Sequence, residues 1–169
     1  MRAAKAFASA LFFILFAAVA VEAGAEEGLD AFFEATMTDI YGKPMTLSHF
    51  RDRPLIVNFW ARACVACRDE FPVFAALRTK YKKRGLTVLG IALEEDPAKV
   101  REFLTVYKAN YPVALAGGQE GIALMQGLGN DESLLPFTLL INRKGKAILR
   151  KYGLFRKSDF QAVAEELLR

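Results

Sequence analysis

The sequence predicts an α/β protein with a mixed β-sheet flanked by helices. Two mainly apolar runs, Leu55 to Trp60 and Leu86 to Leu93, have the length and composition of buried strands. A helical pattern follows each run, and strand–helix–strand order predicts parallel strands with helices on the faces of the sheet. A third apolar run, Leu135 to Ile141, is followed by a turn and a further strand, Ala147 to Tyr152, which makes the sheet mixed.

The N-terminus has the layout of a secretory signal peptide. Arg2 and Lys5 supply a positive start, the run from Ala6 to Val21 is uncharged, and small residues follow. We therefore predict a signal peptide over residues 1–25 and a single domain over residues 26–169. An uncleaved membrane anchor is the alternative, although the uncharged run is shorter than the roughly 20 residues of a membrane span. Contact with a membrane is expected only in that case.

The charge balance argues against a nucleic-acid partner. The 169 residues carry a formal net charge of only +4. The basic residues from Lys80 to Arg84 are short and isolated, and they suit the end of a helix, where cations complement the helix dipole.

An added β-hairpin is expected before the first buried strand. Residues 31–38 are predicted as an edge strand, and Met45 to Leu47 as its returning partner. Gly42 and Pro44 lie between them and provide the chemistry of a turn.

Helix boundaries are predicted from caps and breakers. A helix is expected from the second cysteine, Cys67, to about Arg84, with a kink at Pro72 and a stop at Gly85. Asp96 followed by proline predicts the start of the next helix.

The last third of the chain is less regular. The glycine-rich residues 117–135 are predicted as a loop with one short helix. Ser158 and Gln161 have the spacing of a capping box, which predicts the start of a final amphipathic helix.

Cys64 and Cys67 are the only cysteines, and they stand where a buried strand gives way to a helix. A helix N-terminus stabilises a thiolate, which favours redox chemistry. A bridge over two residues closes too short a loop to be an effective staple, so a structural disulfide is the weaker interpretation. A zinc site needs four ligands, and the single histidine, His49, is expected at the surface or at a helix start. We therefore expect no metal and no cofactor.

Several motifs together resemble the TlpA/ResA group of exported thiol–disulfide oxidoreductases. They are Asp39-Ile40-Tyr41-Gly42-Lys43 with Leu47 and Phe50, Asn58-Phe59-Trp60, Cys64-x-x-Cys67 with Pro72, and Leu135-Pro136-Phe137-Thr138. The resemblance covers roughly residues 30–168. It implies a thioredoxin-like fold in which Pro136 is a cis-proline facing the dithiol and Trp60 packs beside it.

The dithiol residues receive distinct expected roles. Cys64, at the exposed helix start, is expected to attack the substrate, and Cys67, one turn into the helix, to resolve the mixed disulfide. Glu70 follows Cys67 by one helical turn, and the resemblance implies a carboxylate there that exchanges a proton with the buried thiol. A solvated helix residue is the alternative for Glu70. The Leu135 backbone is expected to be free to pair with a substrate polypeptide.

The residues immediately around the cysteines depart from the pattern of this group. Arg62 and Ala63 replace the usual Thr and Trp, and Val65 and Ala66 stand between the cysteines without the frequent proline. Arg62 is expected either to favour the Cys64 thiolate by its charge or to be a solvated loop residue. These departures affect the reduction potential and the substrate rather than the fold.

The leading functional hypothesis is an exported enzyme that reduces disulfides in other proteins. The resemblance implies pathways such as cytochrome c maturation, with electrons from a membrane thiol carrier and a location in the periplasm or on the outer side of the membrane. A disulfide oxidase or isomerase is the alternative within redox chemistry. A thiol-dependent copper chaperone is a weaker alternative, because no added His or Met ligand lies near the cysteines.

Overall fold

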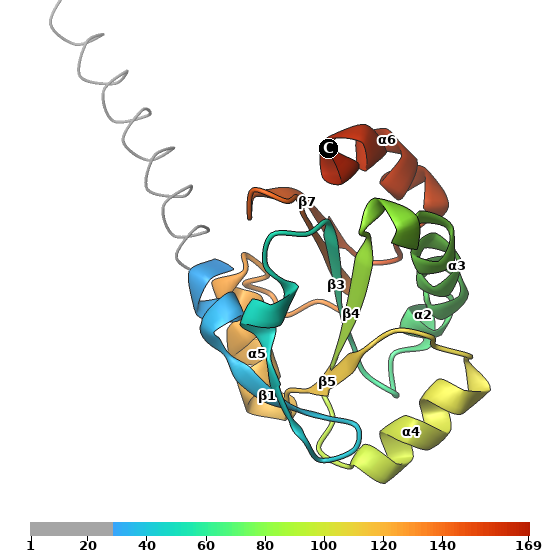
Figure 1. The fold of residues 1–169 in the computed structure, drawn as a ribbon. Helices are drawn as coiled ribbons and strands as arrows, with labels where there is room; N and C mark the ends of the chain where they lie inside the picture. The colour runs from blue at the N-terminus through green and yellow to red at the C-terminus, as the bar shows by residue number, and fades with distance from the viewer. Residues whose placement is uncertain (1–28) are drawn as a thin grey trace, which may run out of the picture.

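The computed structural model describes residues 29–169, and these form a seven-stranded mixed sheet with helices on both faces (Figure 1). The predicted signal peptide, residues 1–25, lies outside the described residues. The order of the strands in the sheet is β2-β1-β5-β4-β3-β6-β7. The strands are β1 (Thr36–Asp39), β2 (Pro44–Thr46), β3 (Leu55–Trp60), β4 (Thr87–Ala92), β5 (Val113–Leu115), β6 (Phe137–Ile141) and β7 (Ala147–Tyr152).

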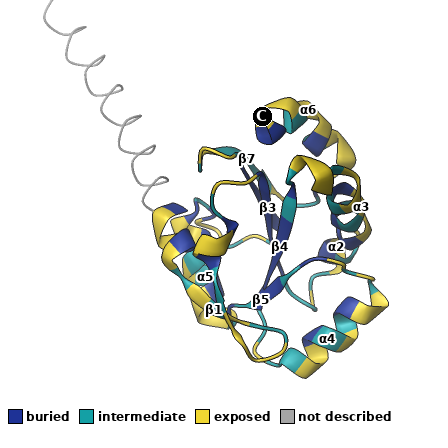
Figure 2. Cartoon of the chain, in the orientation of Figure 1, coloured by how far each residue is buried: buried dark blue, intermediate teal, exposed yellow. Residues whose placement is uncertain are grey.

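Strand β3 lies inside the sheet, between β4 and β6, and every one of its residues is buried (Figure 2). It runs parallel to β4 and antiparallel to β6, and β6 pairs with β7 in the predicted hairpin. β1 and β2 form the expected N-terminal hairpin, which joins the sheet through antiparallel pairing of β1 with β5. The predicted fold class is therefore confirmed.

The sheet divides the core into two layers, and helices cover both of them. After the helical residues 29–34, the helices in chain order are η1 (Leu47–Phe50), α2 (Val65–Arg68), α3 (Phe71–Tyr81), η2 (Lys82–Arg84), α4 (Pro97–Val106), α5 (Gly118–Gly127) and α6 (Lys157–Leu168). Side chains of α3, α4 and α6 pack on one face of the sheet, in the core that contains Cys67 and Trp60. The helical residues 29–34, η1 and α5 pack on the other face. Within residues 29–169, no helix has both the length and the hydrophobicity to cross a bilayer.

The strand predicted over residues 31–38 is wrong in its first half. Residues 29–34 are helical, and β1 begins only at Thr36. Leu29, Phe32 and Phe33 are all buried, and their i, i+3, i+4 spacing places them on one helical face against the core.

The single kinked helix expected from Cys67 to Arg84 is also wrong. The chain forms two helices, α2 and α3, with a break at Asp69 and Glu70. Pro72 lies in the first turn of α3, where its missing N–H costs no hydrogen bond, so it starts a helix instead of bending one. Gly85 does end the segment, with a left-handed φ of 85°.

Two further boundaries differ from the prediction. The glycine-rich segment contains a ten-residue helix, α5, which is longer than expected. The helix α6 begins one residue before Ser158, and the capping side chain is that of Asp159, whose Oδ2 accepts a hydrogen bond from the Arg156 N–H at 2.7 Å. The predicted cap of Asp96 on α4 is confirmed.

Candidate active site

Cys64 and Cys67 lie just beyond the end of β3 and are joined by a disulfide. Cys64 is the N-cap of α2, and its Sγ accepts a hydrogen bond from the Cys67 N–H at 3.2 Å. The Cys64 sulfur therefore faces an otherwise unpaired backbone donor, which is the environment that stabilises a thiolate after reduction. Cys64 is half-buried, whereas Cys67 is completely buried.

Trp60 closes the core beneath the dithiol. Its ring is fully buried in the same cluster as Cys67. It stacks on Phe103 of α4 at 5.2 Å between ring centroids and meets the edge of Phe71 of α3 at 5.0 Å. The three rings form an aromatic cluster in the same core layer as Cys67.

Glu70 is completely buried at the junction between α2 and α3. Its Oε2 accepts a hydrogen bond from Asn58 Nδ2 at 2.9 Å, and its Oε1 accepts one from the Phe155 N–H at 2.6 Å. Asn58 Nδ2 also donates to Thr138 Oγ1 at 3.1 Å. The carboxyl group is thus held by Asn58 of β3 and by the segment after β7, and Glu70 is not a solvated helix residue.

Burial raises the pKa of Glu70 from 4.5 to about 7, because the anion loses its hydration. The donors on Phe155 and Asn58 oppose this rise by stabilising the anion, and the nearby carboxylates of Asp159 and Asp69 add to it. A carboxyl group with a pKa about 7 can accept or release a proton near neutral pH.

The peptide bond between Leu135 and Pro136 is cis, as the sequence predicted. Phe137, the next residue, pairs with Phe59 near the end of β3, which places Pro136 at the edge of the sheet where the dithiol lies. Neither the N–H nor the C=O of Leu135 has a hydrogen-bond partner within residues 29–169. A backbone with free donor and acceptor groups can pair with an extended peptide.

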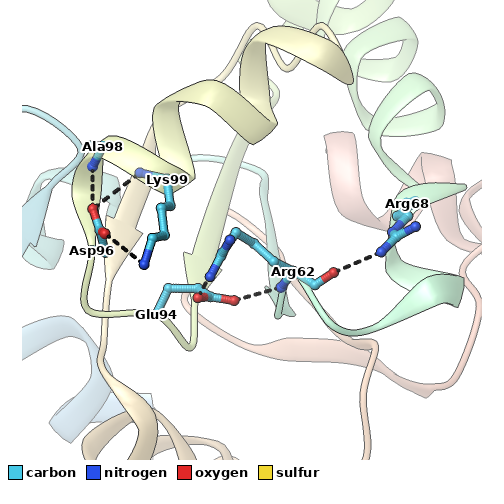
Figure 3. Close-up of polar contacts among 6 residues, drawn as sticks. All are labelled: Arg62, Arg68, Glu94, Asp96, Ala98 and Lys99. Atoms are coloured by element: carbon cyan, nitrogen blue, oxygen red, sulfur yellow. Dashed lines mark hydrogen bonds and ion pairs between the residues drawn. The ribbon is translucent and has the colours of Figure 1, made fainter.

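Arg62 is held by Glu94, which follows β4 (Figure 3). Glu94 accepts hydrogen bonds from the Arg62 backbone N–H at 2.7 Å and from its Nε at 3.0 Å. Arg68 in turn donates to the Arg62 carbonyl at 3.2 Å. The charge of Arg62 is therefore largely offset by a carboxylate, and its effect on the Cys64 thiolate stays a prediction.

Comparison with known proteins places this arrangement in a family. The family model for Redoxin matches residues 29–167. The chain belongs to the Redoxin family. Thiol-disulfide oxidoreductase ResA of Bacillus subtilis (strain 168) is 33% identical over 132 residues, which cover 76% of this redoxin and 70% of that protein. ResA of Bacillus thuringiensis subsp. konkukian (strain 97-27) is 31% identical over 131 residues, which cover 78% and 73%.

Solved structures with a similar fold include proteins described as acting on thiols and disulfides. A thiol:disulfide interchange protein of the thioredoxin family from Chlorobium tepidum TLS is 26% identical, with a TM-score of 0.69 over 80% of this redoxin and 93% of that chain. A secreted thiol-disulfide isomerase from Corynebacterium glutamicum, 20% identical, shares the fold with a TM-score of 0.70 over 80% and 83%. The resemblance to the TlpA/ResA group is confirmed, and this redoxin is a thiol–disulfide oxidoreductase with a Cys-x-x-Cys pair.

The other residues considered for chemistry lie away from the dithiol. His49 is exposed on η1. Within residues 29–169, no three His, Cys, Asp or Glu side chains are grouped so that they could hold a metal ion.

Sequence reasoning missed several partners of this redoxin site. Thr138 is two residues after Pro136, so its place on the same face of β6 as Pro136 could have been found from strand alternation. Phe155 contacts Glu70 through its backbone, and Glu94 pairs with Arg62 across 32 positions of sequence. No local pattern signals either contact.

Proposed function

We propose that this chain reduces disulfide bonds of other proteins outside the cytoplasm, with electrons supplied by a membrane thiol carrier. The observation that carries the exchange chemistry is the Cys64–Cys67 pair at the start of α2, with the buried carboxyl group of Glu70 one turn beyond Cys67. The resemblance to the TlpA/ResA group supports the reducing direction. The signal-like N-terminus supports the extracytoplasmic location. The ResA relatives support thiol–disulfide exchange as the reaction class.

The reaction proceeds by two exchange steps. The Cys64 thiolate attacks one sulfur of the substrate disulfide, forms a mixed disulfide, and releases the other substrate sulfur as a thiolate that takes up a proton. Cys67 gives its proton to Glu70 and attacks the Cys64 sulfur. The second substrate thiolate leaves, and the Cys64–Cys67 disulfide seen here results. Two electrons pass to the substrate.

Another dithiol must then reduce the Cys64–Cys67 disulfide. A membrane thiol carrier fits this requirement because it can bring electrons across the membrane to an exported protein. Apocytochrome c, whose cysteines must be reduced before haem attachment, is the substrate that we propose.

The reduction potential of the dithiol tests the direction of the reaction. We expect a value near that of thioredoxin, about −270 mV, for a reductant. Equilibration of the purified chain with glutathione buffers of known potential, followed by thiol labelling, gives the measurement. A value near that of DsbA, about −120 mV, would assign the chain to oxidation instead.

Replacement of the resolving cysteine tests the assignment of the two thiols. Cys67→Ser should accumulate a mixed disulfide with a protein substrate, because Cys64 can attack but nothing can release the adduct. Cys64→Ser is the matched control and should trap nothing. If the control trapped substrate as efficiently, the roles of the two cysteines would have to be exchanged. Non-reducing electrophoresis with purified disulfide-containing apocytochrome c measures both.

A further inference from the structure

A surface cavity of about 380 Å³ is lined in part by Leu134, two residues before the cis-proline, and has no assigned role. We call it the β7 cavity. It is lined by Gly129, Asn130, Asp131, Glu132, Leu134 and Tyr152. Leu134 and Tyr152 are large apolar side chains, yet 48% and 46% of their surface is exposed.

Strand register places Tyr152, which lines the β7 cavity, at the same edge of the sheet as the dithiol, with its ring stacked on Phe137 on the face opposite the layer of Cys67. Phe137 of β6 pairs with Phe59 near the end of β3 on one side and with Tyr152 at the end of β7 on the other. Pro136 therefore lies between the two. Tyr152 is two strand spacings from β3, or about 10 Å, which an extended peptide spans in about three residues.

The wall of the β7 cavity is held in place before any ligand arrives. The buried amide of Asn130 accepts a hydrogen bond from the Leu134 N–H at 3.0 Å and donates one to the Leu134 carbonyl at 2.8 Å. The Tyr152 hydroxyl donates to the Gly129 carbonyl at 2.6 Å. A preformed surface loses little conformational freedom on binding.

The charges around the dithiol are uneven. On the β4 side, Arg62 and Glu94 neutralise each other, whereas Arg68 donates to the Arg62 carbonyl and forms no ion pair within residues 29–169. On the β7 side, Asp131 and Glu132 are exposed, and neither forms an ion pair within residues 29–169. The nearby guanidinium of Arg150 is directed at the Leu128 carbonyl, to which its Nε donates at 3.0 Å.

We propose that the β7 cavity binds a lysine or arginine side chain of the substrate polypeptide, close in sequence to the cysteine that is attacked. The inference rests on the proposed function, because it requires a substrate segment paired with the free backbone groups of Leu135. The methylene stem of the basic residue covers Leu134 and Tyr152, and its charged end meets Asp131 and Glu132. The cavity thus selects substrates by a cation that flanks the cysteine.

Synthetic peptides test this selection. Each peptide carries one cysteine as a mixed disulfide with uncharged 2-mercaptoethanol, and lysine, norleucine or glutamate stands two to four residues away on either side. Norleucine keeps the apolar stem of lysine without its charge. At one position we expect the second-order rate constant for reduction of the peptide by the pre-reduced protein to be about threefold to tenfold higher for lysine than for norleucine, the range that one or two exposed ion pairs provide. Glutamate should be slowest, and added salt should reduce the preference.

Two double variants test whether Asp131 and Glu132 cause the preference for lysine. Asp131→Asn with Glu132→Gln should bring the lysine-to-norleucine ratio to about one. Glu165→Gln with Glu166→Gln on α6 removes the same charge from a distant surface and should leave the ratio unchanged. The inference is overturned if no position favours lysine, or if both double variants lower the ratio equally. If neither the peptides nor uncharged bis(2-hydroxyethyl) disulfide is reduced, the proposed function itself fails.

Discussion

Glu70 makes the stability of the oxidised protein depend on pH in an unusual direction. Its pKa is about 7 in the folded protein, against 4.5 for an ordinary glutamate. Between these values the native state binds more protons than the unfolded state, so the free energy of unfolding falls as pH rises. Ionisation of this fully buried carboxyl group should lower the free energy of unfolding by about 3 kcal/mol at pH 8 relative to pH 4.

Glu70→Gln removes this dependence. The free energy of unfolding of the variant minus that of the parent protein should increase by about 3 kcal/mol from pH 4 to pH 8. Urea denaturation of the oxidised proteins across this range measures the difference. Glu166→Gln, at an exposed position of α6, is the control and should show no such trend. Parallel curves for Glu70→Gln and the parent would show that Glu70 has an ordinary pKa.

The individual residues of the site differ in how far sequence could predict them. Cys64 and Cys67 could be found because their chemistry depends on local spacing at the start of a helix, whereas the cis bond before Pro136 was implied by the resemblance to the TlpA/ResA group. The burial of Glu70 could not be settled, since its partner Phe155 lies 85 positions away. The pairing of Arg62 with Glu94 was missed for the same reason, because tertiary structure alone brings the two together.

At the scale of elements, Gly90 shows how tightly β4 fits between its neighbours. A Cβ atom there would lie 3.0 Å from Val113 Cγ2 and 3.2 Å from Trp60 Nε1. Gly90→Ala should therefore lower the free energy of unfolding by about 1–3 kcal/mol through overpacking. Gly127→Ala in α5 is the matched control, because its Cβ would meet nothing within 4 Å and alanine favours helix by up to about 1 kcal/mol. Equal effects of the two substitutions in denaturant titrations would contradict this packing.

Elements were predicted well where the hydrophobic pattern was unambiguous. β3, β4, β6 and β7 carry long apolar or alternating runs, and each was expected within a few residues of its position. The helical residues 29–34 were misassigned because two adjacent phenylalanines satisfy a short strand as readily as a helix. The break between α2 and α3 was missed because proline is compatible with both a kink and a first turn.

At the scale of the whole molecule, the sheet separates the core layer that contains Cys67 from the core layer of residues 29–34 and α5. The even-numbered residues of β3, among them Asn58 and Trp60, face the layer that contains Cys67, whereas the odd-numbered residues face the layer of residues 29–34 and α5. Sequence order alone indicated a mixed sheet. The complete strand order depends on crossovers that no local pattern specifies.

Two phenylalanines on opposite faces test this separation. Phe32 and Phe71 are both fully buried, but only Phe71 contacts Trp60 in the dithiol layer. Each substitution by alanine should lower the free energy of unfolding by about 3–5 kcal/mol, because both leave a large cavity. Phe71→Ala should also change the reduction potential of the dithiol, because it alters the packing and the water access of the Trp60 ring in the layer of Cys67. Phe32→Ala should leave the potential unchanged. Denaturation and glutathione equilibration on both variants measure the two effects, and equal shifts in potential would show that the two layers are coupled through the sheet.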